Sequence, residues 1–353
     1  MNSSADSAAA EVSELRFPCA DAPVPGMPVE ISDGVLWFRF PLPMALDHVN
    51  VYALRDMDGW TVVDTGINSS LTRKIWLEVM AGPLGGRPVR RVVLTHHHPD
   101  HVGLAGWFKH EFGAEIWSTR VAWLMARMLT LDVQPRHTPE SIRFYRDAGV
   151  PEDMIAARSR ERPFNFADIV HPVPAGFRRI QDGETVEFGR RSWRVRFGGG
   201  HAPDHATFWC REDALIIGGD QFLADISPNI GVYPTEPEAN PLRDWLESCA
   251  RFQDHADNES LVLVGHKVPY TGLEVRLRQL VENHISALGR LREHLIQPRS
   301  AADCLKVLFK RDIDQENYGF AIVESVAHLN FLHQGGEASR SRRNDGAWQF
   351  IAN

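Results

Sequence analysis

The sequence predicts a layered α/β domain that is followed by a smaller, mainly helical domain. First, short apolar and β-branched segments alternate with segments of helical periodicity, a pattern typical of sheets covered by helices. Second, histidine and aspartate residues follow several of these segments, where strands are expected to end. Third, apolar stripes of helical spacing replace the strands late in the chain. We therefore expect an extended arm over residues 1–28, an α/β domain over 29–272 and a C-terminal domain over 273–353.

Composition limits the class of protein. The 353 residues are 43% hydrophobic and 24% charged, and the net charge of -8 does not favour nucleic acid as a partner. The four cysteines form no C-x-x-C pair and are expected to be reduced thiols. No apolar segment approaches membrane-spanning length, and the first residues lack the pattern of a secretory signal. We therefore expect a cytoplasmic protein with a small-molecule substrate and no membrane partner; a homodimer is compatible with the sequence.

The first strands are expected at 35–38, 49–54 and 60–63. The third runs into Asp64, in an Asp-x-Gly sequence that by itself indicates only a turn. Ser70 is expected to cap the helix that follows.

The most informative segment follows the strand expected at 89–94. It has the spacing His-x-His-x-Asp-His, formed by His96, His98, Asp100 and His101. The first two histidines are two residues apart on extended chain, so they point the same way and can bind one metal ion. The proline before Asp100 blocks a helix further upstream, and Asp100 and His101 can turn toward a second ion. Imidazole and carboxylate are ligands of zinc and related divalent metals.

Histidine and aspartate residues also follow the later strands. The segment expected at 193–197 precedes His201 and His205, and further apolar segments end at Asp220 and His266. Each of these elements alone is weak, and a strand that ends in a single aspartate is often only a turn. Together, in this order at strand ends, they strengthen the prediction of a metal site.

These motifs resemble the signatures of the metallo-β-lactamase superfamily of hydrolases, over about residues 30–272. The resemblance implies a four-layer αββα sandwich with the site at one edge between the two sheets. It also implies the metal ligands: His96, His98 and His201 for one ion, Asp100, His101 and His266 for the other, and Asp220 between them.

The resemblance assigns further roles. Asp64 and His205 are expected to support ligand histidines or the surrounding structure. Asp204 stands where many members have glycine, so we expect no positive φ there. Lys267 also replaces a common glycine; it could contact an anionic substrate or point to solvent.

Residues 119–170 are expected to form a helical insertion. Met125, Phe144 and Tyr145 would contact substrate if the insertion were a lid over the site. Methionine and aromatic residues at helical spacing are as often part of ordinary helix packing, so both interpretations remain open.

The C-terminal part is expected to hold three helices and a hairpin with its turn at Asn344-Asp345-Gly346. This resembles the small winged-helix-like domain of the branch that includes lactamase-β-like protein 2. Arg340, Arg342 and Arg343 on the hairpin could contact nucleic acid, but the neighbouring acids favour a solvated hairpin or a packing role.

The expected function is hydrolysis by two divalent ions, zinc by ligand type, with iron or manganese compatible. A hydroxide between the ions would be the nucleophile, and Asp100 would orient it and carry its proton. The glyoxalase II-like ligand pattern favours a thioester, other acyl ester or lactone. The alternatives are a nuclease or phosphodiesterase of the same fold, and a metal-bound regulatory or ligand-binding protein.

Overall fold

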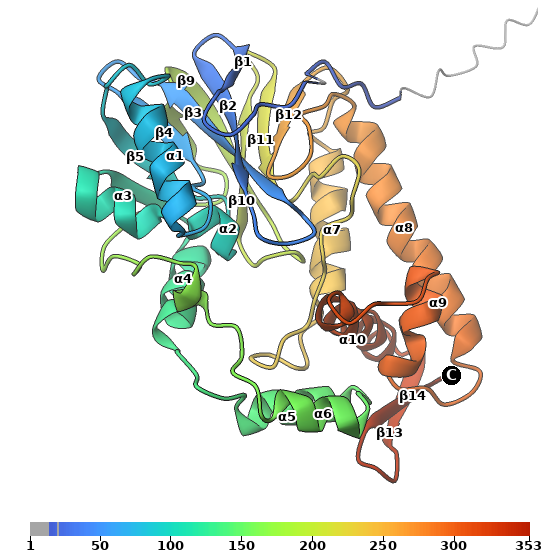
Figure 1. The fold of residues 1–353 in the computed structure, drawn as a ribbon. Helices are drawn as coiled ribbons and strands as arrows, with labels where there is room; N and C mark the ends of the chain where they lie inside the picture. Colours follow the sequence, from blue (N-terminus) through green and yellow to red (C-terminus); the bar gives the residue numbers. More distant parts are fainter. Residues whose placement is uncertain (1–13, 20) are drawn as a thin grey trace, which may run out of the picture.

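The computed structural model describes residues 14–19 and 21–353, so half of the expected N-terminal arm (1–13 and 20) lies outside the described part. Two β-sheets pack face to face, with helices on both outer sides (Figure 1). This confirms the four-layer α/β sandwich. Within the described residues, no helix is long and apolar enough to cross a membrane.

The first sheet has seven strands in sequence order. Strands β1 to β4 pair antiparallel, and β4 to β7 pair parallel. The strands are β1 (Val29–Ser32), β2 (Val35–Pro41), β3 (His48–Arg55), β4 (Trp60–Val63), β5 (Val89–Val93), β6 (Glu115–Ser118) and β7 (Arg178–Arg179).

The second sheet has five strands in the order β12-β11-β10-β9-β8, with only the β11–β12 pair parallel. The strands are β8 (Thr185–Phe188), β9 (Arg191–Gly198), β10 (His205–Cys210), β11 (Leu215–Gly219) and β12 (Leu261–Val264). Trp37 of the first sheet and Trp193 and Phe208 of the second belong to the fully buried cluster between the sheets.

Helices α1 (Ser70–Ala81) and α3 (Ala105–Phe112) cover the outer face of the first sheet, where Trp76 and Phe108 are fully buried. Helices α7 (Pro241–Gln253) and α8 (Leu273–His294) cover the second sheet. Apolar side chains on the outer faces of both sheets therefore find a helix to pack against, which explains the layered arrangement.

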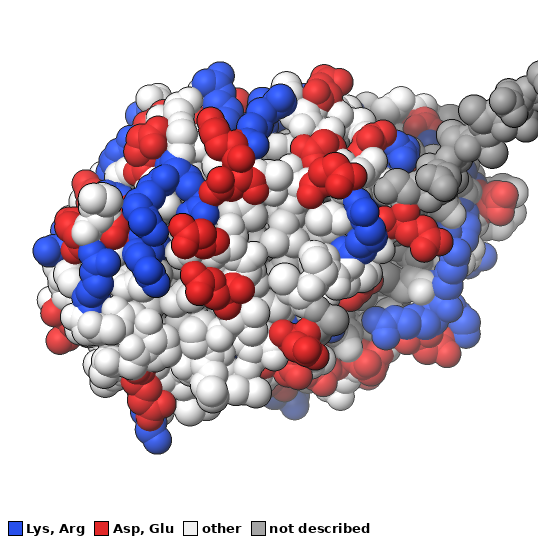
Figure 2. Space-filling view, turned by 90° about the horizontal axis from the view of Figure 1, so that it is seen from above, with Lys and Arg blue, Asp and Glu red and all other residues white. Residues whose placement is uncertain are grey.

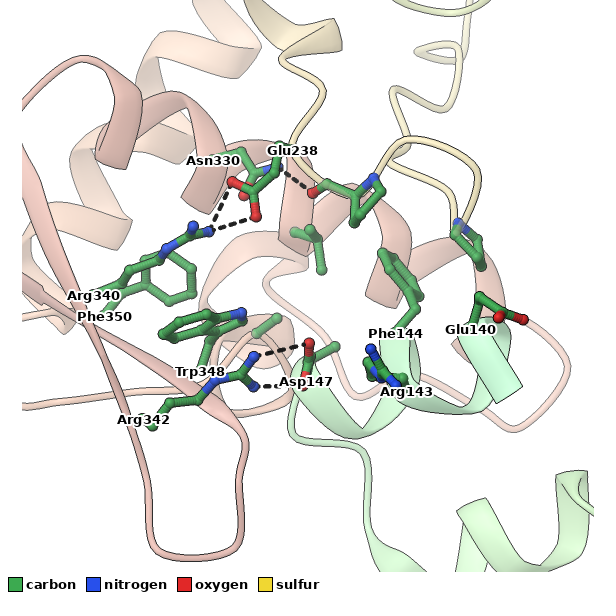
Figure 3. A pocket seen from close by; sticks show the side chains of 15 residues that line it. Glu140, Arg143, Phe144, Asp147, Glu238, Asn330, Arg340, Arg342, Trp348 and Phe350 are labelled. Atoms are coloured by element: carbon green, nitrogen blue, oxygen red, sulfur yellow. Dashed lines mark hydrogen bonds and ion pairs between the residues drawn. The ribbon is translucent and has the colours of Figure 1, made fainter. Parts of the chain in front are cut away.

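The insertion forms α4 (Arg120–Leu131), α5 (Pro139–Asp147) and α6 (Glu152–Arg158). Figure 1 shows α5 and α6 away from the sheets, beside the C-terminal hairpin. A cavity of about 350 Å³ lies between α5 and the hairpin (Figure 3). The pair Arg342–Asp147 bridges this boundary from the hairpin to the end of α5.

After α8 the chain forms the short α9 (Leu305–Phe309), α10 (Tyr318–Gln334) and the hairpin strands β13 (Ala338–Arg342) and β14 (Trp348–Ala352). Ser300 and Asp303 form reciprocal hydrogen bonds before α9: the Ser300 amide donates to the Asp303 carboxylate at 2.9 Å, and the Asp303 amide donates to the Ser300 hydroxyl at 3.4 Å. Buried residues of α8, α10 and the hairpin form one apolar cluster with the outer face of the second sheet.

Three local expectations were wrong. The cap of α1 is Ser69, which accepts from the Thr72 amide at 3.0 Å, because the chain enters the helix one residue earlier than expected. The apolar residues of 102–112 have the spacing of one helix, but α3 begins only at Ala105 and the preceding residues form the separate short α2 (Pro99–Val102). Asp204 has a φ of 48°, a left-handed conformation that aspartate tolerates better than most residues.

Candidate metal centre

The histidine-rich loop leaves β5 between the two sheets and turns at once into α2. Pro99 occupies the first turn of α2, where its missing amide hydrogen and fixed φ are compatible with a helix start. The extended segment before it carries His96 and His98, and the helical turn carries Asp100 and His101. The change from extended to helical backbone separates the four side chains into two pairs.

The first group of ligand atoms comes from His96, His98 and His201, which lie within 4.8 Å of one another. His96 Nε2 and His98 Nδ1 are 3.0 Å apart. His201 enters from the loop between β9 and β10, so this group joins both sheets.

The second group comes from Asp100, His101 and His266. Asp100 Oδ2 lies 3.3 Å from His266 Nε2 and 3.5 Å from His101 Nε2. His266 follows β12, so this group also joins the two sheets.

Asp220 lies between the two groups, directly after β11. Its Oδ1 is 3.5 Å from His101 Nε2, and its Oδ2 is 3.5 Å from His201 Nε2 and 3.2 Å from His266 Nε2. The structure thus brings together all seven residues expected as metal ligands.

Hydrogen bonds from the opposite ring nitrogens orient the ligand histidines. Asp64 Oδ2 accepts from His101 Nδ1 and from the Thr95 hydroxyl, both at 2.8 Å. Because that hydroxyl donates its hydrogen to Asp64, it accepts from His96 Nδ1 at 2.9 Å. Ligand histidines in metalloproteins commonly donate their other N–H in this way, which leaves a lone pair aimed at the metal.

Two main-chain carbonyls orient the remaining histidines. His266 Nδ1 donates to the carbonyl of His48 at 2.8 Å, and His201 Nδ1 donates to the carbonyl of Asn229 at 3.0 Å. Neither His48 nor Asn229 was predicted, because a carbonyl acceptor leaves no signal in the residue type. His205 is buried, and its Nε2 accepts from the Asp220 amide at 3.2 Å, so it holds the backbone of Asp220 in place.

The polar atoms at the centre fit a cation. His101 Nε2, His201 Nε2 and Asp220 Oδ1 are buried without a hydrogen-bond partner. Burial lowers the pKa of His96 and of His98 well below the usual value, so both rings are neutral. Imidazole nitrogens and a carboxylate whose converging atoms lack a hydrogen-bond partner are the donor set of a divalent metal such as zinc.

Gly265 permits the close approach of β12 to the centre. A Cβ atom at this position would overlap Asp220 Oδ1 and would lie 2.8 Å from His101 Cε1. Only glycine therefore lets His266 follow the strand directly into the site.

The residues considered for substrate binding differ in their surroundings. Lys267 is half-buried, with a φ of 69°, and its amide donates to His48 Nε2 at 2.9 Å. Met125 is half-buried on α4. Phe144 is buried and lines the cavity of Figure 3, whose lining contains no metal-centre residue. The Arg158 guanidinium lies over the Tyr145 ring, 4.2 Å from the ring centroid.

Two family models match the chain. Residues 44–294 match the metallo-β-lactamase superfamily, and residues 288–353 match the C-terminal domain of metallo-β-lactamase-like proteins.

Similar proteins agree with these matches. The chain is 25% identical over 306 residues to YqjP, a probable metallo-hydrolase of Bacillus subtilis, covering 85% of this chain and 92% of that one. A crystal structure of a β-lactamase domain protein from Burkholderia ambifaria superposes with a TM-score of 0.89 at 34% identity, covering 96% and 98% of the two chains.

A metallo-β-lactamase family protein from Thermus thermophilus superposes with a TM-score of 0.76 at 28% identity, covering 92% of this chain and 100% of that one. The seven converging residues expected as ligands and the two-sheet sandwich are thus accompanied by family similarity over nearly the whole chain. The chain belongs to the metallo-β-lactamase superfamily and is a metal-dependent hydrolase.

Proposed function

We propose that the protein is a dinuclear metallohydrolase that cleaves a thioester or a related acyl ester or lactone. The observation that carries the dinuclear assignment is the position of Asp220. Its two carboxylate oxygens face histidines of both ligand groups, at 3.2 to 3.5 Å. A carboxylate in this place supports bridging of two ions.

The bound ions would supply an activated water at neutral pH and positive charge for the developing oxyanion. Asp64 holds His101 through a hydrogen bond, and the carbonyls of His48 and Asn229 hold His266 and His201. Asp100 is the most exposed carboxylate of the centre, with 17% of its side chain accessible against 7% for Asp220. We assign to its carboxylate the orientation of the attacking water and the acceptance of its proton.

The acyl substrate class is supported by the ligand set, which is the glyoxalase II-like one. Lys267 adds a half-buried cation directly after the ligand His266. We assign it to an anionic group of the substrate, away from the scissile bond. Removal of this charge would then raise KM more than it lowers kcat.

The nuclease alternative finds little support in the hairpin. Arg340 pairs with Glu238, Arg342 with Asp147 and Arg343 with Asp345, so these cations are already neutralised by acids. On the face seen in Figure 2, basic and acidic side chains are intermixed. Nucleic-acid binding normally needs a basic surface that neutralises several phosphates.

The test compares Asp220→Ala with Asp213→Ala, which alters an aspartate just before the other end of the same strand. Metal is counted by elemental analysis of protein purified without added metal, beside a panel of thioester, lactone, β-lactam and phosphodiester substrates. Asp220→Ala should lose at least one ion per chain and its turnover, while Asp213→Ala should keep both. Full retention of metal by Asp220→Ala would contradict the dinuclear centre, and turnover of the phosphodiester alone would contradict the acyl substrate.

A further inference from the structure

A second cluster of metal-binding residue types lies between α8 and α10, and it shares no residue with the centre described above. It consists of His284 from α8 and of Glu324 and His328 from α10, with one donor atom from each within 4.8 Å of the others. Glu324 and His328 are four residues apart, so they project from the same face of α10. We propose that these three residues form a separate divalent-metal site of structural type, with zinc as its expected ion.

The distance between the two histidines matches metal ligands. His284 Nδ1 and His328 Nε2 are 3.2 Å apart. Two imidazole nitrogens that bind one tetrahedral zinc ion at about 2.0–2.1 Å lie roughly 3.3–3.4 Å from each other. In the catalytic centre, His96 Nε2 and His98 Nδ1 show a similar separation of 3.0 Å.

The tautomers of the pair leave a nitrogen unsatisfied. His328 Nδ1 donates to the carbonyl of Glu324 at 2.9 Å, so its Nε2 carries a lone pair toward His284. If His284 donates from Nδ1, its other nitrogen becomes a buried acceptor, and this Nε2 has no partner. If the hydrogen is on Nε2 instead, two lone pairs face each other at 3.2 Å. A cation between the rings converts these facing lone pairs into ligands.

The surroundings keep both rings in the form that binds metal. His284 and His328 are only 4% and 1% exposed. Burial lowers the pKa of His284 to about 3 and that of His328 to about 4, so both are neutral near pH 7. Trp245 of α7 packs beside His284, with ring centroids 6.3 Å apart, and closes one side of the cluster.

Glu324 would supply the negative charge of the proposed site, and it lies where an ion would enter. No lysine or arginine forms an ion pair with its carboxylate among the described residues, and burial raises the pKa of the group to about 8. A cation beside the carboxylate would favour its charged form. One carboxylate oxygen accepts from Asn229 Nδ2 at 2.8 Å, and the other is free to bind an ion. Glu324 is less buried than His284 and His328, so its side of the cluster is the expected path of entry for an ion.

The site would have a structural effect. It joins α8 to α10, the two long helices that carry much of the C-terminal core. It also meets Asn229, whose carbonyl accepts from the ligand His201. Occupancy would therefore fix the segment that orients one histidine of the catalytic centre.

The experiment counts zinc in the full-length protein after removal of metal and dialysis against Zn²⁺. The double variant His284→Ala/His328→Ala should hold one ion fewer than the unaltered protein. His294→Ala, which alters a half-buried histidine at the end of α8 and outside the cluster, should keep the full number. The difference of one ion is independent of how many ions the catalytic centre holds, and Asp220→Ala reports on that centre separately.

Further measurements distinguish the loss of a metal ligand from misfolding of the variant. His328→Gln keeps the side-chain volume and should also lose one ion, with an unchanged circular dichroism spectrum. Anomalous scattering at the zinc edge should place a peak about 2.0–2.1 Å from His284 Nδ1 and His328 Nε2. Equal zinc content in folded variant and unaltered protein, or no peak between α8 and α10, would overturn the proposal.

Discussion

At the scale of single residues, the candidate metal centre depends on side chains and carbonyls that are not themselves proposed as ligands. Asp64 accepts from the Thr95 amide at 2.9 Å, from the Thr95 hydroxyl and from His101, and it is nearly fully buried. It therefore fixes the start of the histidine loop and one ligand ring at the same time.

We expect Asp64→Asn to weaken metal binding about 10- to 100-fold, because an amide, with one acceptor oxygen, cannot accept from all three donors as a carboxylate does. Zinc titration against a competing chelator measures the change. Asp58→Asn, an exposed carboxylate on the preceding turn, serves as control. Equal affinity in Asp64→Asn and the unaltered protein would show that Asp64 does not support the ligand.

We expect Gly265→Ala to reduce hydrolysis by about 100-fold or more and to lower the metal content. The new methyl group would overlap Asp220 Oδ1, and a displacement of about 1 Å in a catalytic group can have an effect of this size. Gly289→Ala on α8, which meets no atom within 4 Å, should keep full metal content and activity. Normal metal content in Gly265→Ala would argue against this close approach.

The convergence of the proposed ligands could be predicted because each belongs to a short pattern that follows a strand, as His96 and Asp220 do. The atoms that orient them could not be predicted, since the carbonyls of His48 and Asn229 act through the fold and not through their side chains. Asp204 adopts its left-handed conformation in a loop whose path the sequence pattern does not specify.

At the scale of secondary structure, the spacing of apolar residues indicates that a helix is present but does not specify its first residue. α1 shows the limit, because Ser69 and Ser70 are chemically identical candidates for its cap. Only the backbone angles distinguish them: Ser69 is extended, with φ -131° and ψ 160°.

We expect Ser69→Ala to lower the free energy of unfolding by about 1 kcal/mol, because the Thr72 amide loses its acceptor. Ser70→Ala should change it by less than about 0.5 kcal/mol, since this exposed residue is the first of the helix. Urea unfolding followed by circular dichroism compares the two variants. A larger loss in Ser70→Ala than in Ser69→Ala would reverse the assignment of the cap.

The placement of α5 and α6 could not be derived from their sequence. Their apolar residues at helical spacing fit a lid and ordinary packing equally well. The structure packs Phe144 with the C-terminal cluster, beside the hairpin residue Trp348 in the cavity of Figure 3. Contacts between segments so far apart in the chain leave no local pattern.

At the scale of the whole molecule, the strand and helix alternation predicted the layered architecture. The pattern also predicted a C-terminal region of three helices and a hairpin. It did not predict that this region shares one apolar cluster with the second sheet, because that depends on which face of α8 meets which neighbour.

We expect a protein that ends after His294 to aggregate. Leu280, Leu288 and Leu291 of α8 are fully buried, in the cluster that includes α9 and α10. Their exposure would create an apolar surface that soluble proteins avoid. Size-exclusion chromatography of the truncated chain checks this; a soluble monomer with full metal content would show that the C-terminal region is dispensable for folding.

We expect removal of metal by a chelator to lower the melting temperature by several degrees. An ion bound only by the folded chain stabilises it by about 2.7 kcal/mol when present at 100 times its Kd. Differential scanning calorimetry before and after metal removal measures the shift. The shift should be smaller for Asp220→Ala, which has fewer ions to lose; an unchanged melting temperature in the unaltered protein would contradict the expectation.

The distribution of the ligands along the chain also bears on how the protein acquires its ions during synthesis. The segment after β5 carries four of the seven ligands, and it leaves the ribosome well before the others. His201, Asp220 and His266 emerge one after another, each behind a different strand of the second sheet. A nascent chain can therefore hold an ion only loosely until β12 has been made and paired. We therefore expect complete loading to be a late event in biogenesis, since a chain that stalls before His266 lacks one of the proposed ligands.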